Sequence, residues 1–131
     1  MVKNKFTADY QINASKKIVF QYLSTASGLE EWFADQVRIN EDKHFIFNFD
    51  DEDHYARLVA IRTNSHVKFE FYDPKRTDET DNSSVEFKLD ENELTQTLFL
   101  KVMDYSDVYD EEELTAIWEG MVNKLKEIIG G

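Results

Sequence analysis

Three histidines are the side chains of this sequence best suited to bind a metal ion or to exchange protons near neutral pH. His44, His54 and His66 show no H-E-x-x-H or other metal-ligating spacing. A shared site would require them to converge from the ends of separate strands. We therefore expect surface histidines near the starts of strands, and we predict no metal site.

Other nucleophiles and acid–base groups give a similarly weak signal. The acidic run DDED at residues 50–53 lacks the alternating D-x-D-x-D-G spacing of a calcium loop, so we expect a solvated turn. Ser83 and Ser84 stand in a polar loop without the G-x-S-x-G context of a nucleophilic serine. Cysteine is absent, which excludes disulfides, thiolate metal sites and cysteine nucleophiles. We predict no catalytic residue and no cofactor.

The aromatic residues are more informative, because small-molecule pockets are lined mainly by apolar and aromatic side chains. The chain has ten Phe, six Tyr and two Trp. Each of them, taken singly, is better explained as plain core, and only the architecture favours a pocket. Arg57 either points into a cavity, where it would hold a carboxylate or hydroxyl, or extends from the convex face of the sheet. The predicted pocket-lining residues are Trp32, Phe33, Phe47, Arg57, Phe69, Trp118 and Met121.

The elements that would position these residues begin with a strand and two short helices. Apolar and polar residues alternate over residues 6–12, which predicts a strand with one buried face. Ser15 can cap a helix that runs to about Ser24. The residues that this helix is expected to bury are Ile18, Val19, Tyr22 and Leu23.

A second, shorter helix is predicted in the stretch SGLEEWF. Ser27 and Glu30 fit a capping box at its start. Its apolar residues share one face: Leu29, Trp32 and Phe33. Because so short a helix is not stable by itself, these side chains must pack against a larger element, as a plug or a gate at the end of a sheet.

Six further strands and one long helix complete the predicted fold. From Gln36 to Met103 alternating segments are joined by short polar turns, which indicates consecutive antiparallel strands. The acidic residues 110–113 and the lysines Lys124 and Lys126 suit the two ends of a final helix, which Gly130 ends. Its apolar stripe is Leu114, Ile117, Trp118, Met121, Val122, Leu125, Ile128 and Ile129.

This order of elements predicts an α+β fold. A curved seven-stranded antiparallel sheet is expected, with two short helices after the first strand and a long C-terminal helix packed across the concave face. The space between the sheet and that helix is then either filled by large side chains or left as a pocket.

Three motifs carry a resemblance to a known family: IVFQYL at residues 18–23, GLEEWF at 28–33 and WEGMVNKL at 118–125. With them, the chain resembles the START-like, Bet v 1-type (SRPBCC) helix-grip superfamily, and most closely the group named after the activator of Hsp90 ATPase. The resemblance implies a single START-like domain over residues 1–131. Members of such families bind lipids, sterols or polyketides, act on bound aromatic intermediates, or assist a chaperone.

The charge balance narrows the range of partners. The 15 Lys and Arg against 27 Asp and Glu give a net charge of −12, which disfavours nucleic acid and anionic membrane surfaces. No apolar run has the length of a signal peptide core or a membrane span, so we expect a cytoplasmic protein without membrane insertion. We expect a monomer or a weak homodimer, in which an edge strand near Val37 would pair between chains.

Three functions remain open at this point. The first is a non-enzymatic binding module that encloses a small apolar or amphipathic ligand between the sheet and the last helix. The second is a co-chaperone-like module that meets a protein partner through its acidic surface. The third is an enzyme acting on a bound aromatic or polyketide-like substrate, which would need two polar groups with perturbed pKa values facing one cavity.

Overall fold

A curved antiparallel sheet and one long helix form the frame of the protein. The computed structural model describes residues 3–75, 82–107 and 110–130. The strands are β1 (Asn4–Ile12), β2 (Gln36–Ile39), β3 (Phe45–Phe49), β4 (Glu52–Arg62), β5 (His66–Tyr72), β6 (Ser84–Asn92) and β7 (Thr97–Ser106). The helices are α1 (Lys16–Ser24), α2 (Ala26–Trp32) and α3 (Glu111–Ile129).

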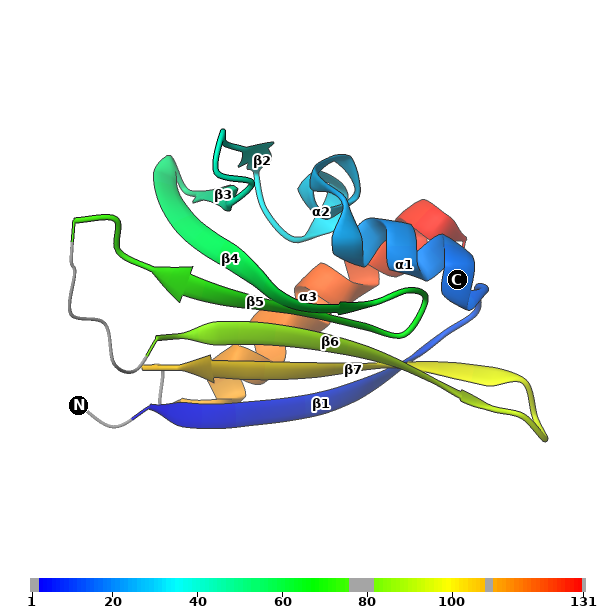
Figure 1. Cartoon of the computed structure of the whole chain (residues 1–131). Coiled ribbons are helices and arrows are strands. Elements are labelled where there is room, and N and C mark those ends of the chain that lie inside the picture. The colour runs from blue at the N-terminus through cyan, green and yellow to red at the C-terminus, as the bar shows by residue number, and fades with distance from the viewer. Residues whose placement is uncertain (1–2, 76–81, 108–109, 131) are drawn as a thin grey trace.

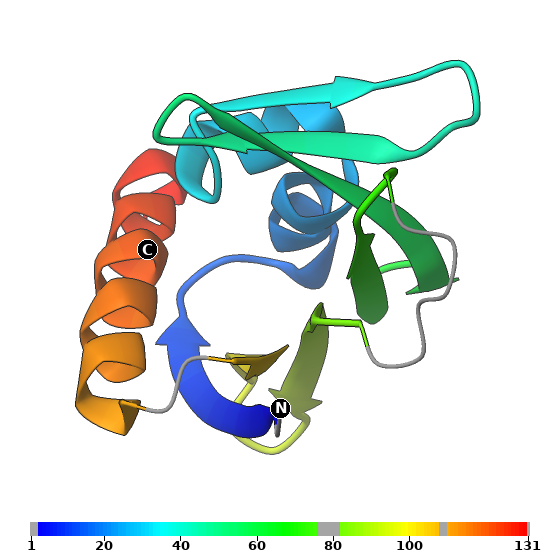
Figure 2. The same cartoon turned by 90° about the vertical axis from the view of Figure 1, so that its left-hand side faces the viewer.

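The seven strands form one sheet in the order β1-β7-β6-β5-β4-β3-β2, and every neighbouring pair is antiparallel. Figure 1 shows α3 behind the sheet, α2 near β2, and α1 next to α2. In Figure 2 the sheet curls from β1 and β7 round to the β2–β3 hairpin, and α3 stands across the open side. The predicted α+β helix-grip architecture is confirmed.

Turns with left-handed residues join β2 to β3, β3 to β4, β4 to β5 and β6 to β7. Phe49 of β3 pairs with Glu52 of β4, so Asp50 and Asp51 alone form the turn, with φ angles of 51° and 65°. Two-residue hairpins of this kind need positive φ at both central positions, which aspartate tolerates better than most residues. The predicted acidic turn is therefore shorter than expected, because the second half of residues 50–53 belongs to β4.

The first helix begins where the sequence predicts. The Ser15 hydroxyl accepts a hydrogen bond from the amide of Ile18 at 3.2 Å, as expected of an N-cap. Val19 and Leu23 are buried, whereas Ile18, which we expected in the core, is 49% exposed.

The predicted start of the second helix was wrong. Thr25, and not Ser27, is the N-cap of α2: its hydroxyl accepts from the amide of Gly28 at 3.0 Å. The same hydroxyl donates to the carbonyl oxygen of Gln21 at 2.7 Å. One threonine side chain thus connects the end of α1 to the start of α2, which a serine two residues later cannot do.

Gly28 allows the two short helices to meet at close range. A Cβ atom at this position would lie 2.2 Å from the carbonyl oxygen of Gln21 and 2.7 Å from the Cα atom of Tyr22. Only glycine fits so close an approach of two backbones. The junction holds α2 so that its apolar side chains enter the core, and all three of the predicted ones are buried: Leu29, Trp32 and Phe33.

The long helix has caps at both ends. The Asp110 carboxylate accepts from the amides of Glu112 and Glu113, and Gly130 ends the helix with a φ of 79°. The buried face of α3 consists of Leu114, Trp118, Val122 and Leu125. The predicted apolar stripe is broader than this face, and its outer members Ile117 and Ile128 are 46% and 36% exposed.

Aromatic rings fill much of the space between the sheet and α3. The ring of Phe33 meets that of Phe47 edge-on at 5.3 Å and stacks on that of Trp118 at 5.8 Å between centroids. Phe69 and Phe87 are fully buried in the same cluster. These separations lie in the range in which aromatic pairs attract beyond simple burial. Among the described residues, no helix combines the length and apolar character that a membrane crossing requires.

Candidate functional site

An open groove runs along one flank of α3. Its volume is about 410 Å³, and its opposite wall comes from the end of α2, the segment that follows it, and the end of β3. The residues that line it are Trp32, Phe33, Ala34, Asp35, Phe49, Ala116, Ile117, Gly120, Met121 and Lys124. This size falls within the roughly 300–1,000 Å³ of small-molecule sites.

One flank of α3 forms one wall of the groove. Successive residues turn by about 100° around a helix axis, so Ile117, Met121 and Lys124 project on the same side. This side lies next to the buried face and not on it. Ile117 is consequently 46% exposed and contributes apolar surface to the groove.

Gly120 opens the middle of this wall. Apart from its chain neighbours and the backbone of its own helix, no heavy atom of the described residues lies within 4 Å of the position that a Cβ atom would take at Gly120. Glycine inside a helix lowers helix stability by roughly 0.5–1 kcal/mol relative to alanine, and here no close contact requires it. The residue therefore leaves open space at the groove at the expense of local helix stability.

The opposite wall is fixed in place by hydrogen bonds and ring contacts. The Trp32 indole N–H donates to the carbonyl oxygen of Tyr22 at 2.8 Å, which anchors the tryptophan to α1. The ring of Phe33 contacts that of Phe49 edge-on at 5.4 Å. A wall whose rings are held on both sides offers a preformed apolar surface, so a ligand would not have to order it on binding.

Two charged residues line the groove, and their surroundings differ. The Asp35 Oδ2 atom accepts a hydrogen bond from the backbone amide of Asp50 at 2.9 Å, and the Asp35 amide donates to the carbonyl oxygen of Asn48. Lys124 is exposed, and within the described ranges its ammonium group has neither an ion pair nor a hydrogen bond. The groove thus combines apolar walls with one cation that is available to a ligand.

The predicted pocket residues fall into three places. Trp32, Phe33 and Met121 lie on the groove. The other aromatic candidates, Phe47, Phe69 and Trp118, lie in the aromatic core behind it.

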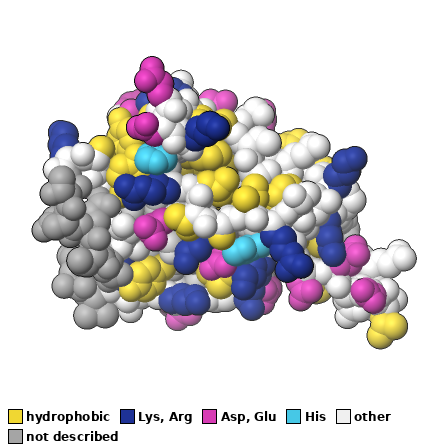
Figure 3. Space-filling view, in the orientation of Figure 1, with side chains coloured by type: hydrophobic (Ala, Val, Ile, Leu, Met, Phe, Trp, Pro, Cys, Tyr) yellow, Lys and Arg dark blue, Asp and Glu magenta, His cyan; other side chains and the backbone are white. Residues whose placement is uncertain are grey.

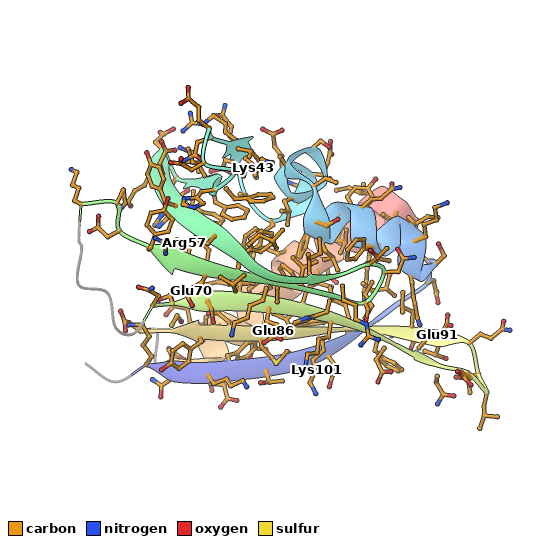
Figure 4. All side chains as sticks on the ribbon, viewed as in Figure 1. Lys43, Arg57, Glu70, Glu86, Glu91 and Lys101 are labelled. Carbon is orange, nitrogen blue, oxygen red and sulfur yellow. The ribbon has the colours of Figure 1, made fainter. Side chains whose placement is uncertain are left out.

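Arg57 lies on the other face of the sheet, since its neighbour Ala56 is fully buried and successive side chains of a strand alternate. Figure 4 shows Arg57 beside Glu70, its cross-strand partner on β5. Its guanidinium carbon stands 4.0 Å from the ring centroid of Tyr72, a cation–π distance. Of the two placements considered for Arg57, the structure therefore shows the one on the convex face.

The convex face of the sheet also holds two of the histidines. His44 Nδ1 lies 2.6 Å from the Tyr72 hydroxyl, and His66 Nε2 contacts a carboxylate oxygen of Glu86. Figure 3 shows basic, acidic and histidine side chains interspersed over this face, with apolar areas between them. His54 is exposed on β4, in edge contact with the ring of Phe49. The three histidines thus occupy separate places.

A part-buried polar contact lies under the N-terminal half of α3. Asp104 of β7 is on the inner face of the sheet, where its Oδ2 atom accepts a hydrogen bond from the indole N–H of Trp118 at 2.8 Å. Burial raises the pKa of Asp104, and the hydrogen bonds from Trp118 and Ser106 offset part of that rise. Burial and the nearby charge of Glu119 raise the pKa of Tyr10. Neither Asp104 nor Tyr10 lines the groove.

Several groove residues carried no recognisable site signal in the sequence. Lys124 was predicted only as a charge that suits the C-terminal end of a helix, and Asp35 and Phe49 were not singled out as site residues. Gly120 carried a usable signal, because an isolated glycine inside a strongly periodic helix lowers helix stability relative to alanine.

Comparison with known proteins places the fold in a family. The sequence profile of the START-like superfamily domain matches residues 1–131. The chain belongs to the START-like superfamily. No curated protein sequence matches it significantly.

Solved structures of START-like proteins resemble this one over nearly its whole length. A protein of Bacteroides fragilis is 36% identical, with a TM-score of 0.63, and the match covers 98% of this chain and 92% of that one. The Aha1 dimer of Colwellia psychrerythraea is 16% identical, with a TM-score of 0.75 and 96% of each chain covered. DynU16, from the dynemicin biosynthetic locus, is 13% identical, with a TM-score of 0.71; the match covers 94% of this chain and 46% of that one.

Proposed function

We propose that residues 1–131 form one non-enzymatic binding domain, which takes up a small apolar or amphipathic molecule in the groove between α3 and the α2–β3 wall. The observation that carries this proposal is the open wall at Gly120. An exposed Ile117 and an unfilled space at a mid-helix glycine leave apolar surface accessible beside a START-like core. Apolar side chains gathered round a concave space are the usual setting of a small-molecule site.

The packed aromatic core behind the groove favours ligand binding in the open groove over binding in a large internal cavity. Trp118 of α3 contacts Phe33 and Phe87, so rings of the last helix and the sheet meet directly. A ligand would then lie along the flank of α3 with part of its surface in water. The carboxylate in the groove, Asp35, accepts a hydrogen bond from the backbone amide of Asp50, which supports a structural role for it. A binding role requires no further group.

A neutral fluorescent probe tests this proposal directly. N-phenyl-1-naphthylamine becomes fluorescent in apolar surroundings and carries no charge at neutral pH. We expect it to bind the wild-type protein with a saturable signal, and Gly120→Ala to retain this binding. Gly120→Phe places a ring in the groove and should weaken binding at least roughly tenfold, since excluding even two methylene-sized groups removes about 1.6 kcal/mol.

The matched control is Asn123→Phe, which adds the same ring to an exposed position of α3 that does not line the groove. Equal loss of binding in both phenylalanine variants, or no loss in Gly120→Phe, would place the probe elsewhere and contradict the proposal. Circular dichroism and thermal unfolding show whether each variant is folded before its binding is compared.

A further inference from the structure

The position of Lys124 defines which kind of molecule the groove suits. Its side chain starts from the same flank of α3 as Ile117 and Met121, and it is exposed. A lysine stem covers apolar surface while its ammonium group stays at the edge of the water. The apolar walls therefore end at a positive charge.

Lys124 is the one cationic residue among those that line the groove. The protein as a whole carries a net charge of −12, so anions are repelled by the molecule at long range. Like several other exposed lysines of the described ranges, Lys124 has no carboxylate partner, and its position at the groove is what makes its charge available to a ligand there. One carboxylate oxygen of Asp35 accepts a hydrogen bond from the backbone amide of Asp50, which stabilises its negative charge within the fold.

We propose that the groove selects amphipathic molecules whose polar end is a carboxylate. The ammonium group of Lys124 pairs with the carboxylate, and the apolar body of the molecule lies against Trp32, Phe33 and Met121. This inference rests on the proposed function, because it specifies the ligand class of the same groove. A volume of about 410 Å³ suits a medium-chain carboxylic acid rather than a large lipid.

Three ten-carbon molecules with different ends separate the possibilities. Decanoate, decanol and decylamine share one apolar body and differ in the charge of the head group. Each is titrated as a competitor against bound N-phenyl-1-naphthylamine at pH 7.5, where decanoate is ionised and decylamine is protonated. The apparent affinity of each is measured for the wild type, Lys124→Met and Lys126→Met.

Lys124→Met keeps an unbranched apolar stem and removes the charge. We expect it to weaken the binding of decanoate about 3- to 10-fold, as for an exposed charge-assisted contact, and to leave the binding of decanol unchanged. Lys126→Met changes the net charge by the same amount on the opposite flank of α3 and should alter neither. The comparison isolates the local contact from the charge of the whole protein.

Several outcomes overturn this inference and leave the proposed function intact. In the first, the probe binds, but Lys124→Met weakens the binding of decanoate no more than it weakens the binding of decanol. Another is equal loss of decanoate binding in Lys124→Met and Lys126→Met, which would be a general charge effect. A third is preferential binding of decylamine that Asp35→Asn weakens, which would assign the polar contact to Asp35. Failure of the neutral probe to bind the wild type would instead contradict the proposed function itself.

Discussion

Replacing Asp104 should reveal how the protein accommodates a carboxylate beneath its last helix. The substitution Asp104→Asn retains an oxygen that accepts from the indole N–H of Trp118 but removes the charge at every pH. We compare it with Asp104→Ala, which is also uncharged but offers no acceptor. The three proteins differ at one side chain that does not line the groove.

The sign of the pH effect follows from the raised pKa of Asp104. Burial raises this pKa in the folded protein, so between the ordinary and the raised pKa the folded state binds more protons than the unfolded chain. The free energy of unfolding contributed by Asp104 therefore falls as the pH rises through that interval. Asp104→Asn lacks this loss, so the stability of this variant relative to the wild type should increase as the pH rises from the ordinary pKa of an aspartate through the raised one.

The magnitude has two parts. Each unit by which the folded-state pKa exceeds the unfolded one corresponds to about 1.4 kcal/mol of stability lost by the wild type at neutral pH. The second part is the hydrogen bond itself. Trp118 is 2% exposed, so Asp104→Ala leaves its indole N–H without an acceptor. At pH 7 the alanine variant should be about 1–3 kcal/mol less stable than the asparagine variant.

Urea unfolding followed by circular dichroism, at several pH values, measures both parts. Parallel stability curves for the wild type and Asp104→Asn over the whole pH range would show that burial does not raise this pKa. Equal stability of the asparagine and alanine variants at pH 7 would show that the contact with Trp118 contributes nothing. Either result would refute the reasoning about the inner face of the sheet.

Three further predictions concern the helices, and urea unfolding measures all of them. Thr25→Ala should lower the free energy of unfolding by about 1 kcal/mol through loss of the α2 cap, whereas Ser27→Ala should change it little; the opposite order would restore Ser27 as the cap. Gly28→Ala should destabilise the protein by roughly 2 kcal/mol or more, because the added Cβ meets backbone atoms of α1; a neutral result would mean that the junction relaxes freely. Gly120→Ala should stabilise it by roughly 0.5–1 kcal/mol, and a large loss would indicate a packing role for this glycine.

The sheet and the last helix were predictable because each has one buried face. Alternation places Val67 and Phe69 in the core and Lys68 on the other face, and the strand pairing confirms that pattern. The cap of α2 was not predictable in the same way, since Thr25 and Ser27 both carry a hydroxyl near the helix start. The choice between them depends on the contact of Gly28 with α1, which is a tertiary feature.

The candidate site was only partly predictable for a related reason. Trp32 and Met121 were singled out from residue type, and both lie on the groove. The placement of Arg57 depends on the side of the sheet to which Ala56 points, and residue types alone left that choice open. Lys124 gains its importance from the flank of α3 that the sheet leaves uncovered. The spacing of apolar residues along the helix does not predict which flank stays uncovered.

The central claim is that a small apolar molecule binds beside α3, and an NMR titration of the labelled protein with N-phenyl-1-naphthylamine tests it most directly. We expect saturable shifts of the amides at residues 32–35 and 116–124, including Gly120, with little change on the convex face. Shifts confined to the strands around Arg57 and Tyr72, or no saturable shift at all, would contradict it.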